Sequence, residues 1–265
     1  VATNQRVWAP DLATPAGRDL VDAYVEQITH LPDGVRTVVL PEQSFGSTEA
    51  MPDALVAPMS RVAAQRGITI VVGFAHWAPN AKYNYALVFP AQGGAPVVYL
   101  KHHDMVSPPG HDLVILDRAG IEICLDVNHA DPTRDYAAAG SQLLLIPASD
   151  ENDNGWQHSR TALLRGVENG QAIVWSDRTG TVMISDGYGR VRADAHTGGP
   201  DPFTTVVADL PTGPGATLYT RLGDWFAWLC LAIALATLAL QLRTCRRRRR
   251  RRSPERTCRR PPTRR

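Results

Sequence analysis

The feature that most constrains this chain is a run of 18 residues without a charge, from Trp225 to Leu242. At about 1.5 Å per residue, a helix of this length spans about 27 Å, which is near the lower limit for crossing a membrane. Trp225 and Trp228 stand at its start, and seven consecutive arginines, 246–252, follow it. Tryptophans favour a membrane interface and arginines favour the cytoplasmic side. We therefore predict a transmembrane helix over 225–242, with the preceding residues outside the cytoplasm and the chain in the cytoplasmic membrane.

The tail that follows, 243–265, carries 13 arginines and one acid, and it is predicted to be a disordered cytoplasmic tail. Its expected role is to hold the topology by touching anionic lipid, where each basic residue contributes about 1 kcal/mol. Arginine runs also bind nucleic acid, but no aromatic residue is interleaved here, and we expect no such binding. Before residue 243, 15 basic residues stand against 25 acidic ones, so the globular part is acidic.

Residues 1–211 alternate strand-like and helix-like segments, which predicts one layered α/β domain. The linker that follows, 212–224, begins with a Gly- and Pro-rich stretch. We find no internal repeat. The predicted strands are 35–40, 68–74, 85–89, 97–100 and 142–146, and the predicted helices are 16–29, 60–66 and 158–169. Gly170 is the stop signal of the last of these helices.

Three polar residues stand where predicted strands end. Glu42 follows the run 38–41, Lys101 follows 97–100, and Cys124 closes the apolar run that starts at Gly120. A carboxylate, an amine and a thiol on neighbouring strand ends are a candidate base, charge-stabilising group and nucleophile. The other three cysteines lie in the apolar run and the tail, so no disulfide framework is expected in the domain, and no Cys/His spacing suggests a metal site.

The sequences around these residues, Leu-Pro-Glu, Tyr-Leu-Lys-His-His and Ile-Cys-Leu-Asp, resemble in order the Glu-Lys-Cys triad of the nitrilase (carbon–nitrogen hydrolase) superfamily. Within it, three later stretches, 165–170, 177–191 and 217–225, resemble segments of the apolipoprotein N-acyltransferase family, the last being its Gly-Asp-Trp run before the last membrane helix. The resemblance covers residues 1–242. It implies an α/β fold in which a four-layer α-β-β-α nitrilase-type sandwich is followed by one C-terminal transmembrane helix.

The resemblance also implies a function. Cys124 would take an acyl chain from a phospholipid as a thioester and pass it to the N-terminal amine of a lipoprotein, without a cofactor. Glu42 would act as general base, and Lys101 would favour the thiolate and stabilise the oxyanion. Two alternatives remain open. With water as acceptor, the protein is a membrane-anchored amidase acting on a small amide. If Cys124 is inert, as single buried cysteines usually are, the domain is a catalytically silent binding module. No residue in the sequence decides the oligomeric state.

Further residues are expected behind the triad or against the substrate. We expect Asp126 to orient the site and Glu168 to hold Arg165 in place. The full set of these additional residues is His103, His111, Asp112, Asp126, Trp156 and Glu168.

The chain departs from the family pattern in three places. His111 stands where the family has an additional glutamate, and Asp112 is the neighbour that could replace it. The segment 149–156 is acidic, which suits a cationic acceptor better than an acyl chain. The family carries several membrane helices before the point where Val1 begins, so the sequence predicts either a fragment or a reduced form with one C-terminal anchor.

Overall fold

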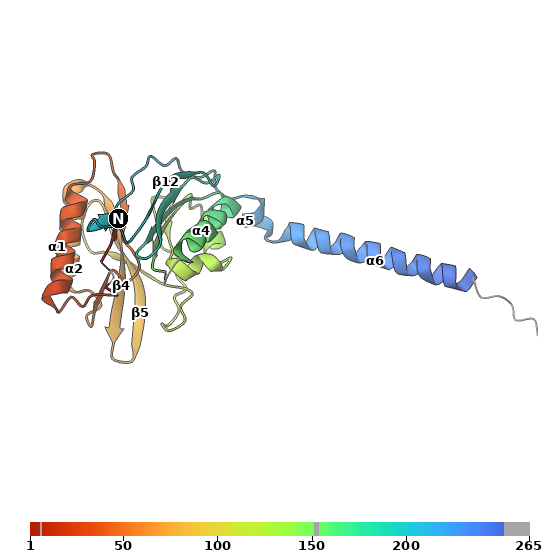
Figure 1. Cartoon of the computed structure of the whole chain (residues 1–265), viewed down its shortest axis with the longest axis horizontal. Coiled ribbons are helices and arrows are strands. Elements are labelled where there is room, and N and C mark those ends of the chain that lie inside the picture. Colours follow the sequence, from red (N-terminus) through yellow and green to blue (C-terminus); the bar gives the residue numbers. More distant parts are fainter. Residues whose placement is uncertain (6, 151–153, 252–265) are drawn as a thin grey trace, which may run out of the picture. The chain divides into compact units, whose positions relative to one another are not determined.

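The structure is a computed structural model that describes residues 1–5, 7–150 and 154–251. The chain divides into two units, Val1–Arg221 and Leu222–Arg265. The first unit holds the strands and all but the last of the long helices, and the second holds the apolar helix (Figure 1).

The first sheet follows the order β2-β4-β5-β6, with β3 also paired to β4. Its middle is a long antiparallel hairpin, β4 with β5, in which Ile70 pairs with Phe89 at one end and Ala78 with Ala81 at the turn. The strands of this sheet are β2 (Thr37–Val39), β3 (Phe45–Ser47), β4 (Thr69–Ala78), β5 (Ala81–Phe89) and β6 (Val97–Leu100).

The second sheet has six strands in the order β12-β11-β10-β9-β8-β7. Its centre is parallel, because β9 pairs in parallel with both β8 and β10. A short pair, β1 (Ala2–Thr3) with β13 (Phe203–Thr204), forms a separate two-stranded sheet. The strands of the second sheet are β7 (Ile115–Leu116), β8 (Ala119–Ile121), β9 (Leu143–Ala148), β10 (Ala172–Asp177), β11 (Thr181–Ser185) and β12 (Val191–His196).

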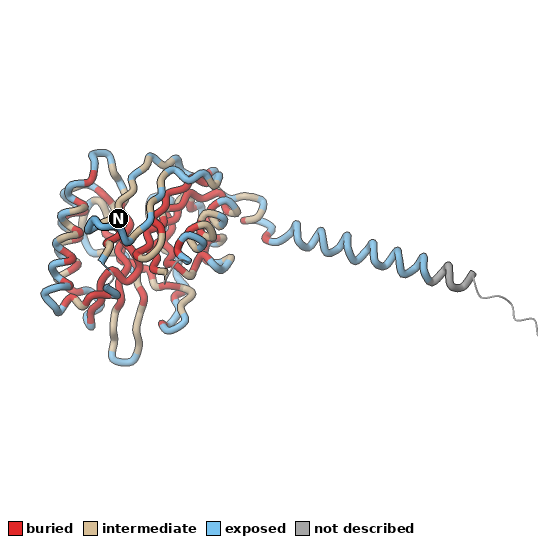
Figure 2. The backbone as a smooth tube through the Cα atoms, viewed as in Figure 1, coloured by how far each residue is buried: buried red, intermediate tan, exposed pale blue. Residues whose placement is uncertain are grey.

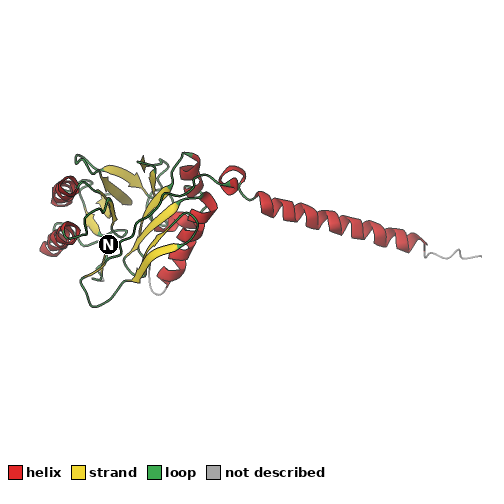
Figure 3. Ribbon diagram, turned by 90° about the horizontal axis from the view of Figure 1, so that it is seen from above, coloured by secondary structure: helices red, strands yellow, loops and turns green. Residues whose placement is uncertain are grey.

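Helices cover the outer face of each sheet, as Figure 3 shows from above. The helices α1 (Pro15–Thr29) and α2 (Asp53–Arg66) pack on the first sheet, around Tyr24, Met59 and Phe74. A second core joins the inner faces of the two sheets, and the helices α3 (Thr133–Ala138) and α4 (Gly155–Asn169) bury Tyr136 and Ala162 in it. The buried backbone accordingly runs through the middle of the domain (Figure 2). The predicted α-β-β-α sandwich is confirmed.

Most predicted elements are present, with shifted ends. Gly170 ends α4 in the left-handed conformation at φ 67°, as its position predicted. The helix predicted from residue 60 begins earlier, at Asp53, and contains Pro58 in its interior. Burial of Leu55 and Met59 in the first core outweighs the backbone hydrogen bond that the proline removes.

Part of the predicted linker, 212–224, is hydrogen-bonded to the domain. Gly213 donates to Gln142 O at 3.0 Å and Gly215 donates to Gly170 O at 2.9 Å, so its first residues lie against the domain. The short helix α5 (Leu218–Leu222) follows, and Thr220 in it donates to Asn169 Oδ1 at 3.0 Å. The hydrogen bonds thus hold this segment to the end of α4.

The second unit contains α6 (Trp225–Arg251). Its segment Trp225–Cys245 is long and apolar enough to cross a membrane, and its residues are exposed along this length (Figure 2). The sequence predicts a disordered tail from residue 243, whereas α6 continues beyond Leu242 as far as Arg251. Arginine is a good helix former, and adding residues to an existing helix costs far less than starting one. The rest of the tail, 252–265, lies outside the described residues.

Candidate active site

Glu42 lies just beyond the end of β2, and its position is fixed by contacts to both sheets. Its backbone N–H donates to Ala148 O of β9 at 3.1 Å. Gly73 of β4 lies directly behind this segment, so closely that a Cβ there would overlap Pro41 O and the Glu42 backbone. The close approach aims the carboxylate into the space between the two sheets.

Lys101 follows β6, and its Nζ lies 2.7 Å from Glu42 Oε1. Burial alone would lower the pKa of Lys101, but the Glu42 carboxylate beside it outweighs this effect and raises that pKa. Lys101 is therefore cationic in the folded protein, and the two groups form a buried ion pair.

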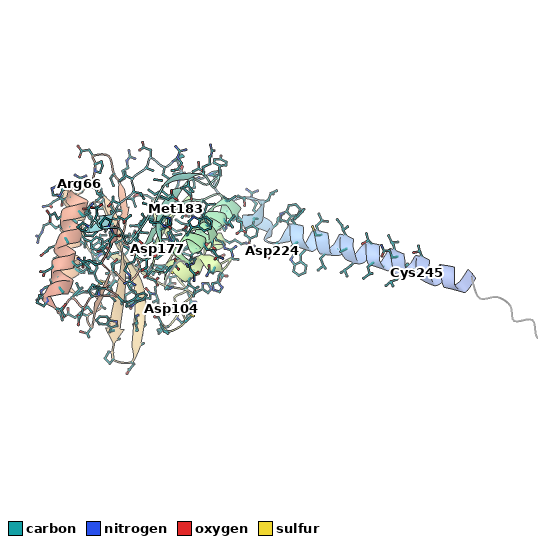
Figure 4. All side chains as sticks on the ribbon, viewed as in Figure 1. Arg66, Asp104, Asp177, Met183, Asp224 and Cys245 are labelled. Carbon is teal, nitrogen blue, oxygen red and sulfur yellow. The ribbon has the colours of Figure 1, made fainter. Side chains whose placement is uncertain are left out.

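Two further residues, which the sequence analysis did not single out, complete this polar cluster. Asn84 Nδ2 of β5 donates to Glu42 Oε1 at 2.6 Å and to Asp104 Oδ2 at 2.9 Å. Asp104 also lies 3.7 Å from Lys101 Nζ. Lys101 thus faces two carboxylates, and the second is three residues beyond it in sequence (Asp104 is labelled in Figure 4). The sequence alone does not single out Asn84, which lies between Tyr83 and Tyr85 in β5, and only the structure shows that it is fully buried.

The sequence predicted that Cys124 ends a strand, and this prediction is wrong. The strand β8 stops at Ile121, and Cys124 opens the 3₁₀ helix η1 (Cys124–Asn128) with a positive φ of 45°. A side chain other than glycine is strained in this conformation and persists there only when its surroundings enforce it. The turn aims the thiol into the same cavity as Glu42 and Lys101.

Asp126 enforces this turn. Its fully buried carboxylate accepts hydrogen bonds from Ile123 N at 2.9 Å, His103 N at 2.7 Å and Tyr99 Oη at 2.7 Å. These donors come from β6, from the segment after it and from the residue before the thiol. Asp126 therefore joins the Lys101 segment to the Cys124 segment.

The thiol itself is buried, with 6% of its residue surface exposed. Burial raises the pKa of Cys124 well above its usual range, and the Glu42 carboxylate raises it further, while Lys101 opposes both effects. Lys101 lowers the pKa of the Cys124 thiol, as expected, but burial raises this pKa by more. The resting thiol is therefore protonated, and a role as nucleophile would require a base to remove its proton.

The triad lines a cavity of about 620 Å³. Its walls come from both sheets: Glu42 and Lys101 follow strands of the first, and Cys124 and Asp150 follow strands of the second. Trp8 stands at this cavity between two cations, Lys82 at 5.7 Å and Arg178 at 4.1 Å from its ring.

The cavity also contains a histidine that the sequence analysis placed only at a helix start. His158 of α4 has its Nδ1 2.8 Å from Asp150 Oδ1 and 4.0 Å from Cys124 Sγ. The ligand-type atoms of these three residues all lie within 4.8 Å of one another, so they could hold a metal ion, which the sequence spacing did not suggest. Spatial rather than sequential proximity creates this trio.

The remaining predicted residues fall into two groups. His103 lies behind the turn, with its ring stacked on His129 at 3.7 Å and its Nδ1 3.5 Å from Asp126. Glu168 accepts from Arg165 at 2.6 Å, and Arg165 in turn donates to Val127 O at 2.9 Å, so this pair ties α4 to η1.

The second group lies away from the triad. His111 and Asp112 are exposed, and His111 packs near the ring of His102. Trp156 is half-exposed beneath Arg160. Among the described residues, those lining the cavity include none of these three. Asp104, and not His111 or Asp112, supplies the additional carboxylate beside Lys101. Part of the acidic loop that contains Trp156, residues 151–153, lies outside the described residues.

A family model for carbon-nitrogen hydrolases matches residues 6–219 of the chain. The chain belongs to the carbon–nitrogen hydrolase family. Among solved structures, it is similar to Nit3 of Saccharomyces cerevisiae, a member of branch 10 of the nitrilase superfamily, with a TM-score of 0.63 and 20% identity. That match covers 74% of this chain and 85% of Nit3, and it supports the fold.

Curated relatives of this carbon–nitrogen hydrolase include apolipoprotein N-acyltransferases. An apolipoprotein N-acyltransferase of Geobacter metallireducens is 32% identical over 146 residues, covering 51% of this chain and 27% of that protein. Another of Gloeobacter violaceus is 25% identical over 271 residues, covering 88% of this chain and 50% of that protein. The chain thus spans half or less of the length of these relatives. The resemblance to an apolipoprotein N-acyltransferase-like nitrilase domain is confirmed.

Proposed function

We propose that this carbon–nitrogen hydrolase is an acyltransferase that moves an acyl chain from a membrane phospholipid to the N-terminal amine of a lipoprotein. The observation that carries the proposal is the cavity in which Glu42, Lys101 and Cys124 converge. The two relatives named apolipoprotein N-acyltransferase support the choice of donor and acceptor.

In the first half-reaction, Cys124 Sγ attacks the ester carbonyl of the phospholipid while Glu42 takes the thiol proton. Glu42 is suited to this role because the resting thiol is protonated and the carboxylate is held by Lys101 and Asn84. A carbon–sulfur bond forms, the ester carbon–oxygen bond breaks, and Glu42 returns the proton to the leaving alcohol. The Lys101 ammonium stabilises the negative charge that develops on the carbonyl oxygen.

In the second half-reaction, the acceptor amine attacks the thioester carbonyl. A carbon–nitrogen bond forms, the carbon–sulfur bond breaks, and Glu42 takes the proton that the amine loses while the sulfur regains one. The cavity wall includes the carboxyl groups of Glu42, Asp104 and Asp150, which attract an ammonium group. Lys82 and Lys101 line the same cavity, so its carboxyl groups exceed its lysines by one, which supports an amine acceptor.

The acyl chain requires an apolar entrance, and two exposed side chains supply one. Met105 and Val106 line the cavity and are 89% and 76% exposed. Such large exposed apolar side chains next to a polar site are typical of a surface that receives lipid. The helix α6 supports a membrane location, and we propose that the catalytic domain is extracytoplasmic and that the arginine-rich end is cytoplasmic.

The first test is to incubate the detergent-solubilised chain with a defined phospholipid and to measure the intact mass. We expect a mass increase of one acyl group, absent in Cys124→Ala, and its transfer to a peptide whose N-terminal cysteine is lipidated. If no adduct forms while Cys124 is still alkylated and a small amide is hydrolysed, the protein is an amidase and the proposal fails. If Cys124 does not react with any electrophile, the domain is catalytically silent.

A further inference from the structure

Lys82 is a charged side chain of the cavity that the proposed mechanism does not use. It lines the cavity together with Lys101, which is held by Glu42 at 2.7 Å and Asp104 at 3.7 Å. The ion pairs of the described residues include none for Lys82. Partial burial lowers the pKa of Lys82, and Asp104 and Glu42 offset this effect only in part. The ammonium has thus lost water without gaining a carboxylate in contact among those residues.

The register of the β4–β5 hairpin places Lys82 outward from the triad. Side chains alternate along a strand, so Lys82 and Asn84 point to the same face of β5. Asn84 donates to Glu42 Oε1 at 2.6 Å, so this face is the one directed at the triad. Two residues along a strand span about 7 Å. Lys82 lies on the side of Asn84 that leads to the exposed turn 79–80, where the hairpin projects from the domain (Figure 1).

Trp8 stands beside Lys82, with its ring 5.7 Å from the Lys82 Nζ. The buried guanidinium of Arg178 lies 4.1 Å from the same ring and donates to Val7 O at 3.0 Å, which fixes the position of Trp8. Arg178 also donates to Ser149 Oγ at 2.7 Å, and it is not among the described residues that line the cavity. Of the two cations beside Trp8, Lys82 is therefore the one that a ligand in the cavity can reach.

Apolar side chains share the cavity with this cation. Trp8 is 46% exposed, and the strongly exposed Met105 and Val106 also line the cavity. A site that combines an ammonium, an indole and aliphatic groups suits a glycerophospholipid, because that lipid joins an anionic phosphate to apolar chains. The phosphate lies one glycerol unit from the ester carbonyls. With an ester carbonyl at Cys124, the phosphate extends outward by that unit, as Lys82 does from Asn84.

We propose that the Lys82 ammonium binds the phosphate of the phospholipid donor and so directs an ester carbonyl of that lipid to Cys124. Ammonium groups form strong charge-assisted hydrogen bonds to phosphate. The carboxyl groups of Glu42, Asp104 and Asp150 line the same cavity and repel a phosphate, so the phosphate is favoured at Lys82. The role of Lys82 in catalysis rests on the proposed acyl transfer, but the binding of a phosphate at Lys82 does not.

The test compares two alkylating reagents, N-iodoacetyl-ethanolamine and its phosphate ester. Both carry the same electrophile, and in the second the phosphate follows the carbonyl at the spacing found in a glycerophospholipid. Peptide mass spectrometry measures the labelling rate at Cys124 separately from the other cysteines. The ratio of the two rates at Cys124, phosphate reagent over neutral reagent, cancels the intrinsic reactivity of the thiol. It therefore reports only the recognition of the phosphate.

Lys82→Gln removes the charge, Lys82→Arg keeps it, and the exposed Arg61→Gln of α2 is the matched control for loss of one cation. We expect the ratio to be about fivefold lower in Lys82→Gln than in the wild type, Lys82→Arg and Arg61→Gln. This difference should shrink at high salt, because the ammonium is partly exposed. Circular dichroism and the melting temperature show whether each variant is folded.

The same ratio in Lys82→Gln and the wild type overturns the proposal, since another group then recognises the phosphate. No labelling of Cys124 by either reagent also overturns it, because the cavity then admits no such ligand. Labelling needs no acyl transfer, so these results stand even if the proposed function fails.

Competition distinguishes a lipid phosphate from a free one. A diether phospholipid, which has no ester to cleave, should slow labelling of the wild type by the phosphate reagent and should act more weakly on Lys82→Gln. Inorganic phosphate at the same concentration should have little effect. If inorganic phosphate competes as well as the lipid, the site binds free phosphate and the assignment to the donor lipid is wrong.

Discussion

Lys101 Nζ lies 2.7 Å from Glu42 Oε1, and 7% and 4% of the two side chains are exposed. Removing one partner of such a pair leaves the other as an unpaired buried charge, which is more costly than losing the pair. The stability of the domain and the chemistry of the cavity therefore depend on the same contact.

Lys101→Met is expected to lower the free energy of unfolding by about 3–5 kcal/mol, because Glu42 is left buried without its cation. The double variant Glu42→Gln/Lys101→Met should be more stable than Lys101→Met. Thermal unfolding in detergent, followed by tryptophan fluorescence, measures both. The other lysine of the chain, Lys82, is the control, since Lys82→Met removes a partly exposed cation with no carboxylate contact among the described ion pairs. Equal losses in the two lysine variants would contradict this account.

Asp104→Asn is expected to slow acyl-enzyme formation by about tenfold or more, because it removes a carboxylate that, with Glu42, holds Lys101 in place. Single-turnover mass spectrometry with a phospholipid donor measures this rate. The matched control is Asp112→Asn, an exposed carboxylate in the same loop region, which should leave the rate unchanged. If Asp112→Asn is the slower enzyme, the assignment of the additional carboxylate to Asp104 is wrong.

Asp126→Asn places an amide where three donors converge on a carboxylate. An amide accepts through one oxygen only, so we expect a loss of about 1–3 kcal/mol in stability. The turn that holds Cys124 at positive φ should relax, and alkylation of the thiol should change with it. Denaturation and alkylation are measured on the same sample, with the surface variant Asp135→Asn as reference. Unchanged thiol reactivity would show that Asp126 does not hold the turn.

Glu122 gives the domain a predictable pH dependence. Burial, reinforced by Asp126, raises the pKa of this fully buried carboxyl to about 8. A carboxyl whose pKa is higher in the folded state than in the unfolded state stabilises the fold at low pH and loses this effect as pH rises. Melting temperatures should therefore fall between about pH 4.5 and pH 8, the window between the unfolded and the folded pKa of this carboxyl, and Glu122→Gln should flatten the decline. A parallel decline in the variant and the wild type would rule out Glu122 as the source.

Gly73→Ala tests how the Glu42 segment is positioned. A methyl group at this site overlaps Pro41 O and the backbone of Glu42, so either the strand or the segment must shift. We expect a loss of about 1–3 kcal/mol in stability and a larger relative loss in acyl-enzyme formation. Gly199→Ala, where the nearest atom lies 3.9 Å from the added carbon, is the control. Wild-type activity in Gly73→Ala would mean that the segment tolerates displacement.

The sequence predicted the sandwich and the convergence of Glu42, Lys101 and Cys124 because strand ends and family order are local signals. It did not predict Asp104 beside Lys101, since the family pattern directed attention to His111, ten residues beyond the lysine rather than three. The His158–Asp150 contact was also missed. It depends on how α4 packs against the end of β9, and that tertiary relationship has no periodic signature in the sequence.

The sequence also failed to predict the local backbone conformation at Cys124. Cys124 was predicted to end a strand, because the run before it is β-branched and apolar. The chain instead turns after Ile121, and buried hydrogen bonds donated to the Asp126 carboxylate fix that turn. An aspartate two residues after a cysteine does not by itself indicate a positive φ. The donors to Asp126, which come from β6, from the segment after it and from Ile123, select this conformation.

The cavity is divided between two sheets, with the acid–base pair on one and the thiol on the other. The proposed reaction therefore depends on the distance between the two sheets. We expect heating to change this distance before any strand unfolds. We expect activity to vanish on heating while the circular dichroism spectrum is still that of the native protein. Trimming a side chain between the sheets, such as Ile146 or Val71, should widen that interval between inactivation and unfolding.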